Sequence, residues 1–559
     1  MSDEQQRPQP VVVVTGGAIG IGAGIAEAFG RQGAFVVTMD PVVALDGSPQ
    51  SGSSEQTTAE RIVAAGGAAR ASSTSVTDED AVRALFTGLV EEFGALDAVV
   101  NVAGISRPTG FASGTEADWT GVLDVHLNGY LTVLRVALPL MAAAGHGRIL
   151  GVTSGSGWRA ADAGAYSCAK RAVAALTWQV GHAAPPGVTV NALSPIAATR
   201  MVANALSRQA GEGNSSGKSA ASGGVALTAA PPPEHLGPIG AYLASDEFAW
   251  CTGHILFSNG AEVSSVAPPH VLEALRTTDI TSVSGLLDVA VPAALVPAEA
   301  AQVSNGGSVP RLGTAFTDAA GSDLDATARR CLVVADDADW RTALGAALAA
   351  RGVECLEADA SAVGFAGAAE QVDRAAAAGS LDAVVVALAG TGAAPAGDSD
   401  GWAAILDDHA GITDAIRRDA SWVRAVSDLS ARTEQPIRVI TVSAATSAGG
   451  RSRAMSAAQL ARAALGATRQ RVSAFAVAVE SATEAARTNA AALAGHLVGS
   501  ADASALSGAE LVAGHDWIGL RSHPTVAGSV AYGGPELPDW LDGAVRRIVG
   551  GEYAAPHGG

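Results

Sequence analysis

Short apolar runs alternate with longer amphipathic stretches between residues 10 and 260. Residues 10–14 and 34–39 are rich in valine and have the length of strands that are buried on both faces. Residues 23–32, between them, have the pattern of a helix. Further strands of the same kind are expected at 98–104, 149–154, 187–195 and 253–257. This alternation predicts an α/β fold with a parallel sheet.

The same pattern begins again near residue 330. The apolar run at 381–390 repeats the run at 96–104 with one extra residue. Three further pairs share a constant offset of 289 positions (459 minus 170): Ser154 with Ser443, Tyr166 with Met455, and Lys170 with Gln459. Repetition on this scale indicates a whole fold that is present twice. We therefore predict two tandem Rossmann-like domains, each with a doubly wound parallel sheet.

Proline and glycine are frequent between the two repeats. We assign residues 1–266 to the first domain, 267–327 to a tail and linker, 328–535 to the second domain, and 536–559 to a C-terminal tail. Within the linker, residues 270–276 are expected to form a helix, and the apolar residues 286–295 are expected to pack onto the first domain.

Composition limits the kinds of protein that this chain can be. The 559 residues are 48% hydrophobic and 16% charged, which is typical of packed α/β domains rather than of disorder. The net charge is −20 without a long lysine or arginine run, so nucleic acids and acidic membranes are not expected partners. The four cysteines lack metal-ligand spacing and indicate a reducing compartment. Because the N-terminus is polar and no apolar run of about 18 residues is found, we expect a cytoplasmic protein without a membrane span.

A glycine-rich turn directly follows the first predicted strand. Gly16, Gly20 and Gly22 precede the helix at 23–32, where glycines let backbone amides approach a pyrophosphate. The next strand ends at Asp40, about 20 residues further on, as expected for the carboxylate that binds a dinucleotide ribose. A helix cap or a solvated loop residue is the alternative for Asp40. No lysine or arginine lies between residues 19 and 30 or just after Asp40, which favours NAD over NADP.

Tyr166 and Lys170 are four residues apart and share one face if their stretch is helical. A phenol has an ordinary pKa near 10, and a neighbouring ammonium favours the phenolate, so the pair can exchange a proton near neutral pH. Ser154 ends the predicted strand twelve residues upstream. Because the spacing of Tyr166 and Lys170 is common by chance, its meaning depends on the motifs around it.

Five motifs stand together between residues 10 and 263: the turn from Thr15 to Gly22, Asn101 with Ala103 and Gly104, Ser154, the Tyr166/Lys170 pair, and the turn from Asn191 to Pro195. In this combination the first half resembles the short-chain dehydrogenases/reductases. The resemblance implies reversible hydride transfer between a nicotinamide cofactor and a carbonyl/alcohol pair. Tyr166 would be the general acid/base, Lys170 would lower its pKa and hold the nicotinamide ribose, and Ser154 would bind the substrate oxygen.

The resemblance also implies which residues hold the cofactor. The glycine turn would line the pyrophosphate, Asp40 the adenosine ribose, and Asn101 the middle of the dinucleotide. The full expected set is Thr15, Gly16, Gly20, Ile21, Gly22, Asp40, Ser75, Val76, Asn101, Ala103, Gly104, Tyr166, Lys170, Pro195 and Ile196. No metal ion is expected.

The sequence departs from the family pattern at two places. The family's fourth catalytic residue is an asparagine, but His126 stands in its position and Asn128 lies two residues on, so both are candidate catalytic residues. This variant resembles the dehydrogenase domains of peroxisomal multifunctional β-oxidation enzymes. His126 is either a proton relay or a structural histidine bonded to a backbone carbonyl. Ser75 replaces the aspartate that usually contacts adenine, which is expected to weaken that contact without abolishing it.

Trp158 and Arg159 follow Ser154 closely and are expected to wall the substrate pocket, where Arg159 would meet an anionic group. Residues 199–234 stand at the family's substrate-loop position and are rich in glycine and serine, as in a mobile lid. A hydroxyacyl thioester is the first substrate expectation, followed by a steroid or polyketide ketone. Two alternatives stay open: an epimerase or dehydratase with tightly held NAD, and a non-catalytic NAD-binding scaffold or regulator.

The second half has lost the proton-transfer pair. Met455 replaces the phenol and Gln459 the ammonium, and residues 336–340 place three carboxylates and a tryptophan where the glycine turn would bind a pyrophosphate. Members of the resembled family generally associate through the helix that carries the tyrosine and lysine. We therefore expect a non-catalytic second domain that forms an intramolecular pseudo-dimer with the first, and a homodimer of whole chains.

Overall fold

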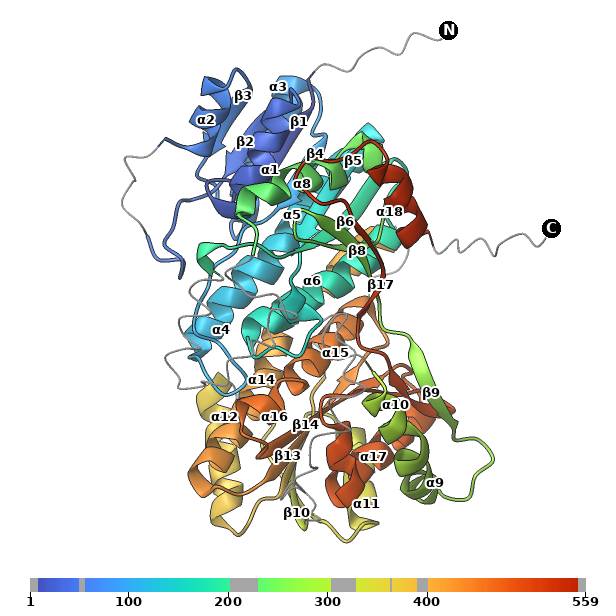
Figure 1. The fold of residues 1–559 in the computed structure, drawn as a ribbon. Helices are drawn as coiled ribbons and strands as arrows, with labels where there is room; N and C mark the ends of the chain where they lie inside the picture. The colour runs from blue at the N-terminus through green and yellow to red at the C-terminus, as the bar shows by residue number, and fades with distance from the viewer. Residues whose placement is uncertain are drawn as a thin grey trace, which may run out of the picture.

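Two α/β units, one built mainly from each half of the chain, lie one above the other (Figure 1). The structure is a computed structural model, and the residues that it describes are 9–49, 56–201, 230–302, 328–361, 364–389 and 401–550. One unit holds a nine-stranded sheet and the other an eight-stranded sheet. The fold class predicted from the sequence is confirmed.

Strands of the first sheet are β1 (Val11–Thr15), β2 (Phe35–Met39), β3 (Ala68–Ser72), β4 (Ala98–Asn101), β5 (Gly147–Val152), β6 (Val188–Pro195), β7 (Ile255–Ser258), β8 (Glu262–Ala267) and β17 (Thr525–Ala531). Their order is β3–β2–β1–β4–β5–β6–β7–β8–β17, and the strands from β3 to β7 are parallel. The valines of β1 are buried on both faces because helices cover both sides of the sheet.

The helical segments of this unit are α1 (Gly20–Arg31), α2 (Thr58–Ala64), α3 (Glu79–Phe93), α4 (Glu116–Leu123), the π-helical turn η1 (Asp124–Asn128), α5 (Gly129–Ala144), η2 (Gly155–Gly157), α6 (Ala165–His182), η5 (Pro233–Leu236), α8 (Gly237–Leu243), η6 (Asp246–Phe248) and α18 (Leu541–Val549). Strands and helices alternate as the hydrophobic pattern predicted.

Strands of the second sheet are β9 (Val271–Arg276), β10 (Arg330–Ala335), β11 (Glu354–Glu357), β12 (Ala383–Ala387), β13 (Ile437–Ala444), β14 (Val472–Val479), β15 (Glu510–Ala513) and β16 (Trp517–Arg521). Their order is β11–β10–β12–β13–β14–β15–β16–β9. Within the described residues this order repeats that of the first sheet from β2 to β17, without a counterpart of β3.

The helical segments of the second unit are α9 (Val283–Ala290), η7 (Val291–Leu295), α10 (Val296–Ala300), α11 (Ala338–Ala349), α12 (Gly364–Ala377), α13 (Gly401–Asp408), α14 (Ile412–Thr433), α15 (Ala448–Ala461), α16 (Ala464–Ala467), α17 (Glu484–Gly499) and η9 (Ala501–Leu506).

Each sheet takes its outermost strand from the other half of the chain. β8 leads into β9, which pairs with β16, and β16 leads into β17, which pairs with β8. Where the two arms cross, the amide of Ser522 donates to the carbonyl oxygen of His270 over 2.7 Å, and the amide of His270 donates to the Ser522 hydroxyl over 3.0 Å. Residues 262–276 and 517–531 thus form one antiparallel ribbon that joins the two units (Figure 1).

This exchange corrects the predicted boundaries. Residues 270–276 are not a helix but contain β9, because their backbone groups pair with β16 rather than with one another. The residues beyond 536 contain α18, whose Asp542 accepts hydrogen bonds from Tyr242 (2.8 Å) and Trp250 (2.9 Å) of the first half. The C-terminal part of the chain therefore packs on the first unit.

The apolar segment at 286–295 packs onto the second half, not onto the first as predicted. Leu287, Val291 and Leu295 are fully buried and are spaced four residues apart, so they form one helical face. This face belongs to the hydrophobic core that α11 and α17 also line.

Helix α6 of the first half packs along α15 of the second (Figure 1). The Ser456 hydroxyl donates to the carbonyl oxygen of Cys168 over 3.0 Å at this contact. One hydrophobic core continues across it and includes Ala169, Ala172 and Ala457. Such small side chains allow two helices to approach closely.

In the part of the chain that the structure describes, two helical stretches are long and apolar enough to cross a membrane by length and composition, so the expectation that no such run exists is wrong. The most apolar window of Glu116–Ala144 is 61% buried inside the protein, and that of Val283–Ala300 is 17% buried. Glu116–Ala144 is as apolar as a membrane-spanning helix because it lies in the hydrophobic core of the protein.

The strand exchange predicts that the first half does not fold alone. We expect residues 1–266 to aggregate, because the free edge of β8 and the apolar side of α6 become exposed. Size-exclusion chromatography and circular dichroism measure the outcome. As a control, residues 1–302 and 328–559 produced together as two chains keep both arms and are expected to assemble. A soluble, folded monomer of residues 1–266 would contradict the prediction.

Candidate active site

Ser154, Tyr166 and Lys170 come together beyond the carboxyl end of β5, at the start of α6. The Ser154 hydroxyl accepts a hydrogen bond from the amide of Ser156 over 3.2 Å and so caps the turn η2. It also hydrogen-bonds the phenol of Tyr166, which stands in the first turn of α6. Lys170 lies one helical turn further, with its Nζ 5.7 Å from the centre of the Tyr166 ring. The three residues predicted from the motifs are neighbours in space.

The loop that carries Ser154 is fixed to the helix that carries Lys170. The hydroxyl of Thr153 donates to the carbonyl oxygen of Lys170 over 2.7 Å. A Cβ at Gly157 would lie 2.8 Å from the carbonyl carbon of Lys170, so only glycine allows this approach. Loop and helix therefore move as one body.

Burial controls the proton affinities of this site. Burial raises the pKa of Tyr166, and the hydrogen bond with Ser154 lowers it in part. Lys170 is 4% exposed, and burial lowers its pKa to about 7. Its Nζ donates to the carbonyl oxygen of Val152 over 2.6 Å. Burial and the Ser154 hydrogen bond account for the shift of the Tyr166 pKa, so the lowering of this pKa by Lys170 stays a prediction.

His126 lies against the Tyr166 ring. The two rings meet edge to face with centres 5.0 Å apart. The Nε2 of His126 lies 2.8 Å from the carbonyl oxygen of Ile105. Burial, together with the charge of Lys170, lowers the pKa of His126 to about 3. His126 is therefore a neutral imidazole bound to a backbone carbonyl, which is the arrangement expected of a structural histidine rather than of a proton relay.

Asn128 does not reach the site. Its side-chain amide donates to Asp124 over 3.0 Å and to Thr413 of the second half over 3.2 Å. The candidate catalytic role of Asn128 is therefore corrected to a contact between the halves. The π-helical turn η1 contains both His126 and Asn128, and such turns are frequent at functional sites.

The glycine turn between β1 and α1 leaves room for a pyrophosphate. Gly16 and Gly20 have φ angles of +63° and +61°. A Cβ at Gly22 would lie 2.2 Å from the carbonyl oxygen of Gly16, so the turn closes only with glycine. Ile19 at the N-cap of α1 provides no capping side chain, and the half-buried Ile21 follows in a first turn without acidic residues. The positive end of the helix thus remains available to an anion.

Asp40 follows β2 beside this turn. Its Oδ2 accepts a hydrogen bond from the amide of Ala18 over 3.2 Å, and its Oδ1 accepts one from Val42 over 2.8 Å. The carboxylate therefore borders the glycine turn, as a ribose ligand requires. Ser75 is bonded to Thr77 over 2.8 Å, and Val76 is buried against Gly129. These residues fit the adenosine part of a dinucleotide.

Thr15 connects the glycine turn to the end of β4. Its hydroxyl donates to the Oδ1 of Asn101 over 2.9 Å and accepts from the amide of Ala103 over 3.1 Å. A Cβ at Gly104 would lie 2.5 Å from His126, so this glycine admits the imidazole. Thr15 and Asn101 hold the loop between the cofactor turn and the Tyr166 site.

Pro195 and Ile196 are half-buried at the carboxyl end of β6. The amide of Ile196 donates to the carbonyl oxygen of Ser258 over 3.0 Å. They share the edge of the sheet that carries the glycine turn and Ser154, where ligands of open α/β sheets bind. The predicted lid at 199–234 lies mostly outside the described residues.

Comparison with known proteins agrees with this geometry. A family profile described as Enoyl-(Acyl carrier protein) reductase matches residues 16–260. The short-chain reductase protein NovJ of Streptomyces niveus is 32% identical over 258 residues, which are 45% of this chain and 93% of NovJ. This chain belongs to the short-chain dehydrogenase/reductase family. It is therefore an oxidoreductase of a family that uses nicotinamide cofactors.

Two further relatives match part of the chain. The peroxisomal hydratase-dehydrogenase-epimerase of Saccharomyces cerevisiae is 35% identical over 198 residues, which are 35% of this chain and 22% of that protein. The cis-4-hydroxycyclohexanecarboxylate dehydrogenase of Sinomonas cyclohexanicum is 38% identical over 188 residues, which are 33% of this chain and 72% of that enzyme.

Trp158 is a core residue of this short-chain dehydrogenase/reductase and not a pocket wall as predicted. It is 2% exposed, and its indole donates to the Ser194 hydroxyl over 3.0 Å. It packs with Trp178 and Ile255 in a hydrophobic cluster. Closeness to Ser154 in the sequence suggested a pocket position, but burial of the large indole decides its place.

Arg159 is a buried cation without a carboxylate partner among the described residues. It is 7% exposed, and its guanidinium lies 4.5 Å from the centre of the Trp158 ring and 5.8 Å from that of Phe257. Its Nη1 is 3.6 Å from the position that a Cβ on Gly155 would take. Burial lowers the pKa of Arg159. The guanidinium is therefore held beside the residue that follows Ser154.

The corresponding turn of the second half is capped by an acidic side chain. Asp337 caps α11 and accepts hydrogen bonds from the amides of Asp339 (2.7 Å) and Trp340 (3.3 Å). Its carboxylate thus occupies the N-terminal end of α11, whereas the equivalent end of α1 has no capping side chain. Asp336 accepts from the amide of Ala389 over 2.9 Å and so lies at the same turn.

Two residues on α15 contact the first half at positions that the sequence did not indicate. Met455 packs against the cluster of Trp158, and Gln459 donates to the carbonyl oxygens of Ser156 (3.0 Å) and Arg159 (2.7 Å). Both had been interpreted only as losses. The offset of 289 positions gave only their equivalence to Tyr166 and Lys170, and nothing in the sequence indicated these contacts.

Proposed function

We propose that this protein is an NAD(H)-dependent dehydrogenase that interconverts a secondary alcohol and a ketone, with Tyr166 as the general acid/base. The observation that carries this proposal is the contact between Ser154 and Tyr166 one helical turn from Lys170, at the sheet edge that also holds the glycine turn. A bound nicotinamide supplies the hydride chemistry.

Each residue of the trio has a distinct task. Ser154 binds the substrate oxygen through its hydroxyl. Tyr166 removes the alcohol proton at its phenol oxygen in oxidation and returns a proton to the carbonyl in reduction. Lys170 binds the nicotinamide ribose with its ammonium. His126, neutral and bound to Ile105, holds the edge of the Tyr166 ring.

Asp40 supports a preference for NAD over NADP. Its carboxylate lies beside the glycine turn, where it accepts from the amide of Ala18 over 3.2 Å. A carboxylate at this place binds the ribose hydroxyls and repels a 2′-phosphate.

Arg159 supports a substrate that carries a carboxylate in addition to the alcohol. A buried guanidinium without a counter-ion is costly, and an anionic substrate group offsets that cost. The relative from Sinomonas cyclohexanicum is named for a ring alcohol with such a carboxylate. Carboxylate-bearing secondary alcohols are therefore the substrate class that we propose.

The second half is proposed to be non-catalytic and to take the place of a partner subunit. Two observations support this: Asp337 caps the end of α11 that would bind a pyrophosphate, and α15 packs along α6.

Tyr166→Phe is expected to lower kcat by about 10²–10⁴-fold, because it removes the proton-transfer group. Binding of NADH, followed by energy transfer from tryptophan, is expected to stay unchanged. In the wild type, alcohol oxidation should be lost as the pH falls, because burial raises the pKa of Tyr166 and the protonated phenol accepts no proton. Tyr130→Phe is the matched control, since Tyr130 is buried and only bonds Thr177 (3.1 Å). Turnover that survives Tyr166→Phe would refute the proposal.

Arg159→Met is expected to raise the KM for a carboxylate-bearing alcohol by about 10–100-fold, because a hydrogen bond to a charged group contributes about 1.5–3 kcal/mol. The KM for the neutral analogue without the carboxylate is expected to stay unchanged. Arg159→Lys keeps the charge and should lie between these values. Steady-state kinetics with the paired substrates provide the measurement. An equal change for both substrates would speak against an anion contact.

A further inference from the structure

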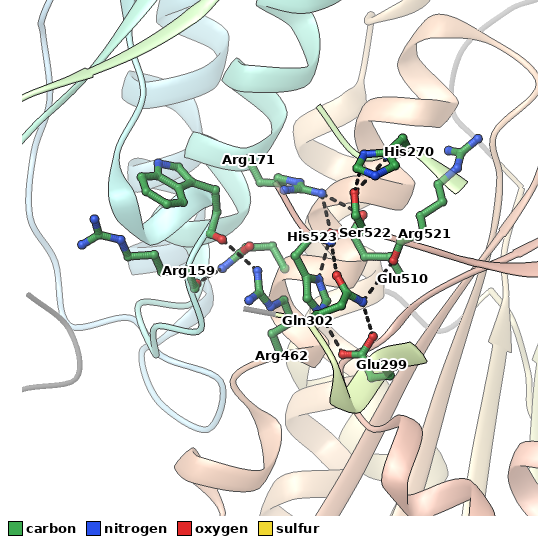
Figure 2. A network of polar contacts seen from close by, with 12 residues as sticks. Arg159, Arg171, His270, Glu299, Gln302, Arg462, Glu510, Arg521, Ser522 and His523 are labelled. Atoms are coloured by element: carbon green, nitrogen blue, oxygen red, sulfur yellow. Dashed lines mark hydrogen bonds and ion pairs between the residues drawn. The ribbon is translucent and has the colours of Figure 1, made fainter. Parts of the chain in front are cut away.

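Three backbone carbonyl groups of the loop between β5 and α6 accept hydrogen bonds from the second half. Gln459 donates to the carbonyl oxygens of Ser156 (3.0 Å) and Arg159 (2.7 Å), and the Nη1 of Arg462 donates to the carbonyl oxygen of Trp158 over 2.9 Å. Among the described residues, these three carbonyl groups accept no hydrogen bond from the first half. Figure 2 shows Arg462 reaching toward the loop across the boundary between the halves.

The two donors are themselves fixed. Gln459 is 1% exposed, so its amide is excluded from water. Burial lowers the pKa of Arg462 to about 10, which leaves its guanidinium charged at neutral pH, and the carboxylates of Glu510 and Glu299 oppose that shift. The buried Gln459 on α15 and the half-buried Arg462 at its C-cap therefore hold three carbonyl groups of the active-site loop.

A network of charges surrounds this contact (Figure 2). Arg171, the residue after Lys170, is fully buried and donates to both oxygens of Glu510 over 2.6 and 2.8 Å. His523 lies 3.3 Å from Glu510 and 2.8 Å from Glu299. The network joins the catalytic helix to the strand β15 and fixes the distance between α6 and the second half.

The same loop orients the catalytic residues. Ser154 caps η2 through the amide of Ser156, and Gly157 touches the backbone of Lys170. Arg159 lies two residues after the end of η2. A displacement of the carbonyl groups that Gln459 and Arg462 hold would therefore move the Ser154 hydroxyl away from Tyr166 and turn the Arg159 guanidinium.

We propose that Gln459 and Arg462 are positioning residues of the first half's active site, which hold the loop at 155–159 in its productive conformation from across the interface. This inference rests on the proposed dehydrogenase function. Gln459, which stands at the position equivalent to Lys170, thus holds the backbone of the loop in the first half's active site. In an isolated first half these three carbonyl groups would lose their protein donors and bond water instead, so the loop would lose this restraint.

The test compares four variants of the full chain. Gln459→Met and Arg462→Met remove the donors at similar size, and Arg462→Lys restores one donor. Ser452→Ala is the matched control, because Ser452 is also a buried residue of α15 that accepts a hydrogen bond from Gln179 of α6 (3.0 Å), away from the loop. Hydrogen–deuterium exchange of the loop amides and steady-state kinetics are measured on each.

In both methionine variants, the amide hydrogens of Gly157, Trp158 and Arg159 should exchange faster than in the wild type. Their kcat should fall by about 10–100-fold, as for a misplaced catalytic group. NADH affinity is expected to stay unchanged. The acidic limb of alcohol oxidation, on which activity is lost as the pH falls, should move to higher pH, because loss of the Ser154 hydrogen bond raises the pKa of Tyr166. Of the groups facing Tyr166, which are Ser154, Lys170 and His126, only the Ser154 hydroxyl lies on this loop, and its hydrogen bond favours the phenolate.

Arg462→Lys should recover part of the kcat, and Ser452→Ala should match the wild type in loop exchange and kcat. Wild-type exchange and kcat in both methionine variants would overturn the proposal, as would an equal loss in Ser452→Ala. If the wild type oxidises no alcohol, the dehydrogenase function fails, whereas the amide exchange still decides whether Gln459 and Arg462 hold the loop.

Discussion

The two crossing arms are the constraint on which the remaining structure depends. A sheet edge with free amide and carbonyl groups invites pairing with another strand, and here each sheet satisfies its edge with a strand from the other half. The hydrogen bonds between His270 and Ser522 fix the crossing point. Because neither sheet is complete without the other half, the two repeats form one folding unit. That unit places α15 against α6, and so brings the second half to the catalytic loop.

The buried charges at this interface also hold the two halves of the chain together. Arg171 and Glu510 are desolvated, and removal of one partner from such a pair costs about 3–5 kcal/mol, because the other charge is left buried alone. Although burial by itself raises the pKa of Glu510, Arg171 and His523 lower it overall. The pair therefore stabilises the fold above the ordinary pKa of glutamate, and this contribution is lost as the pH falls through the lower folded value.

The motifs of the first half were sufficient to predict its fold and the grouping of Ser154, Tyr166 and Lys170, because these residues stand at a strand end and a helix start that a sequence displays. Three of the predictions that were wrong concern residues whose contacts lie in the other half of the chain. The segment with β9 was predicted to be helical because its pairing partner, β16, lies some 240 residues away along the chain (517 minus 276 gives 241). Asn128 was placed in the site because no local signal indicates Thr413. Gln459 was treated as a lost lysine because its hydrogen bonds are made to backbone atoms, which leave no pattern in a sequence.

One fold occurs twice, and we propose that the chemistry is confined to the first copy. The turn at Gly16–Gly22 leaves the end of α1 free, whereas Asp337 caps the equivalent end of α11. The most direct measurement of this claim is the number of NADH molecules that bind to one full-length chain in isothermal titration calorimetry. One NADH per chain is the predicted result. Two NADH molecules per chain would contradict the claim that only the first half binds the cofactor.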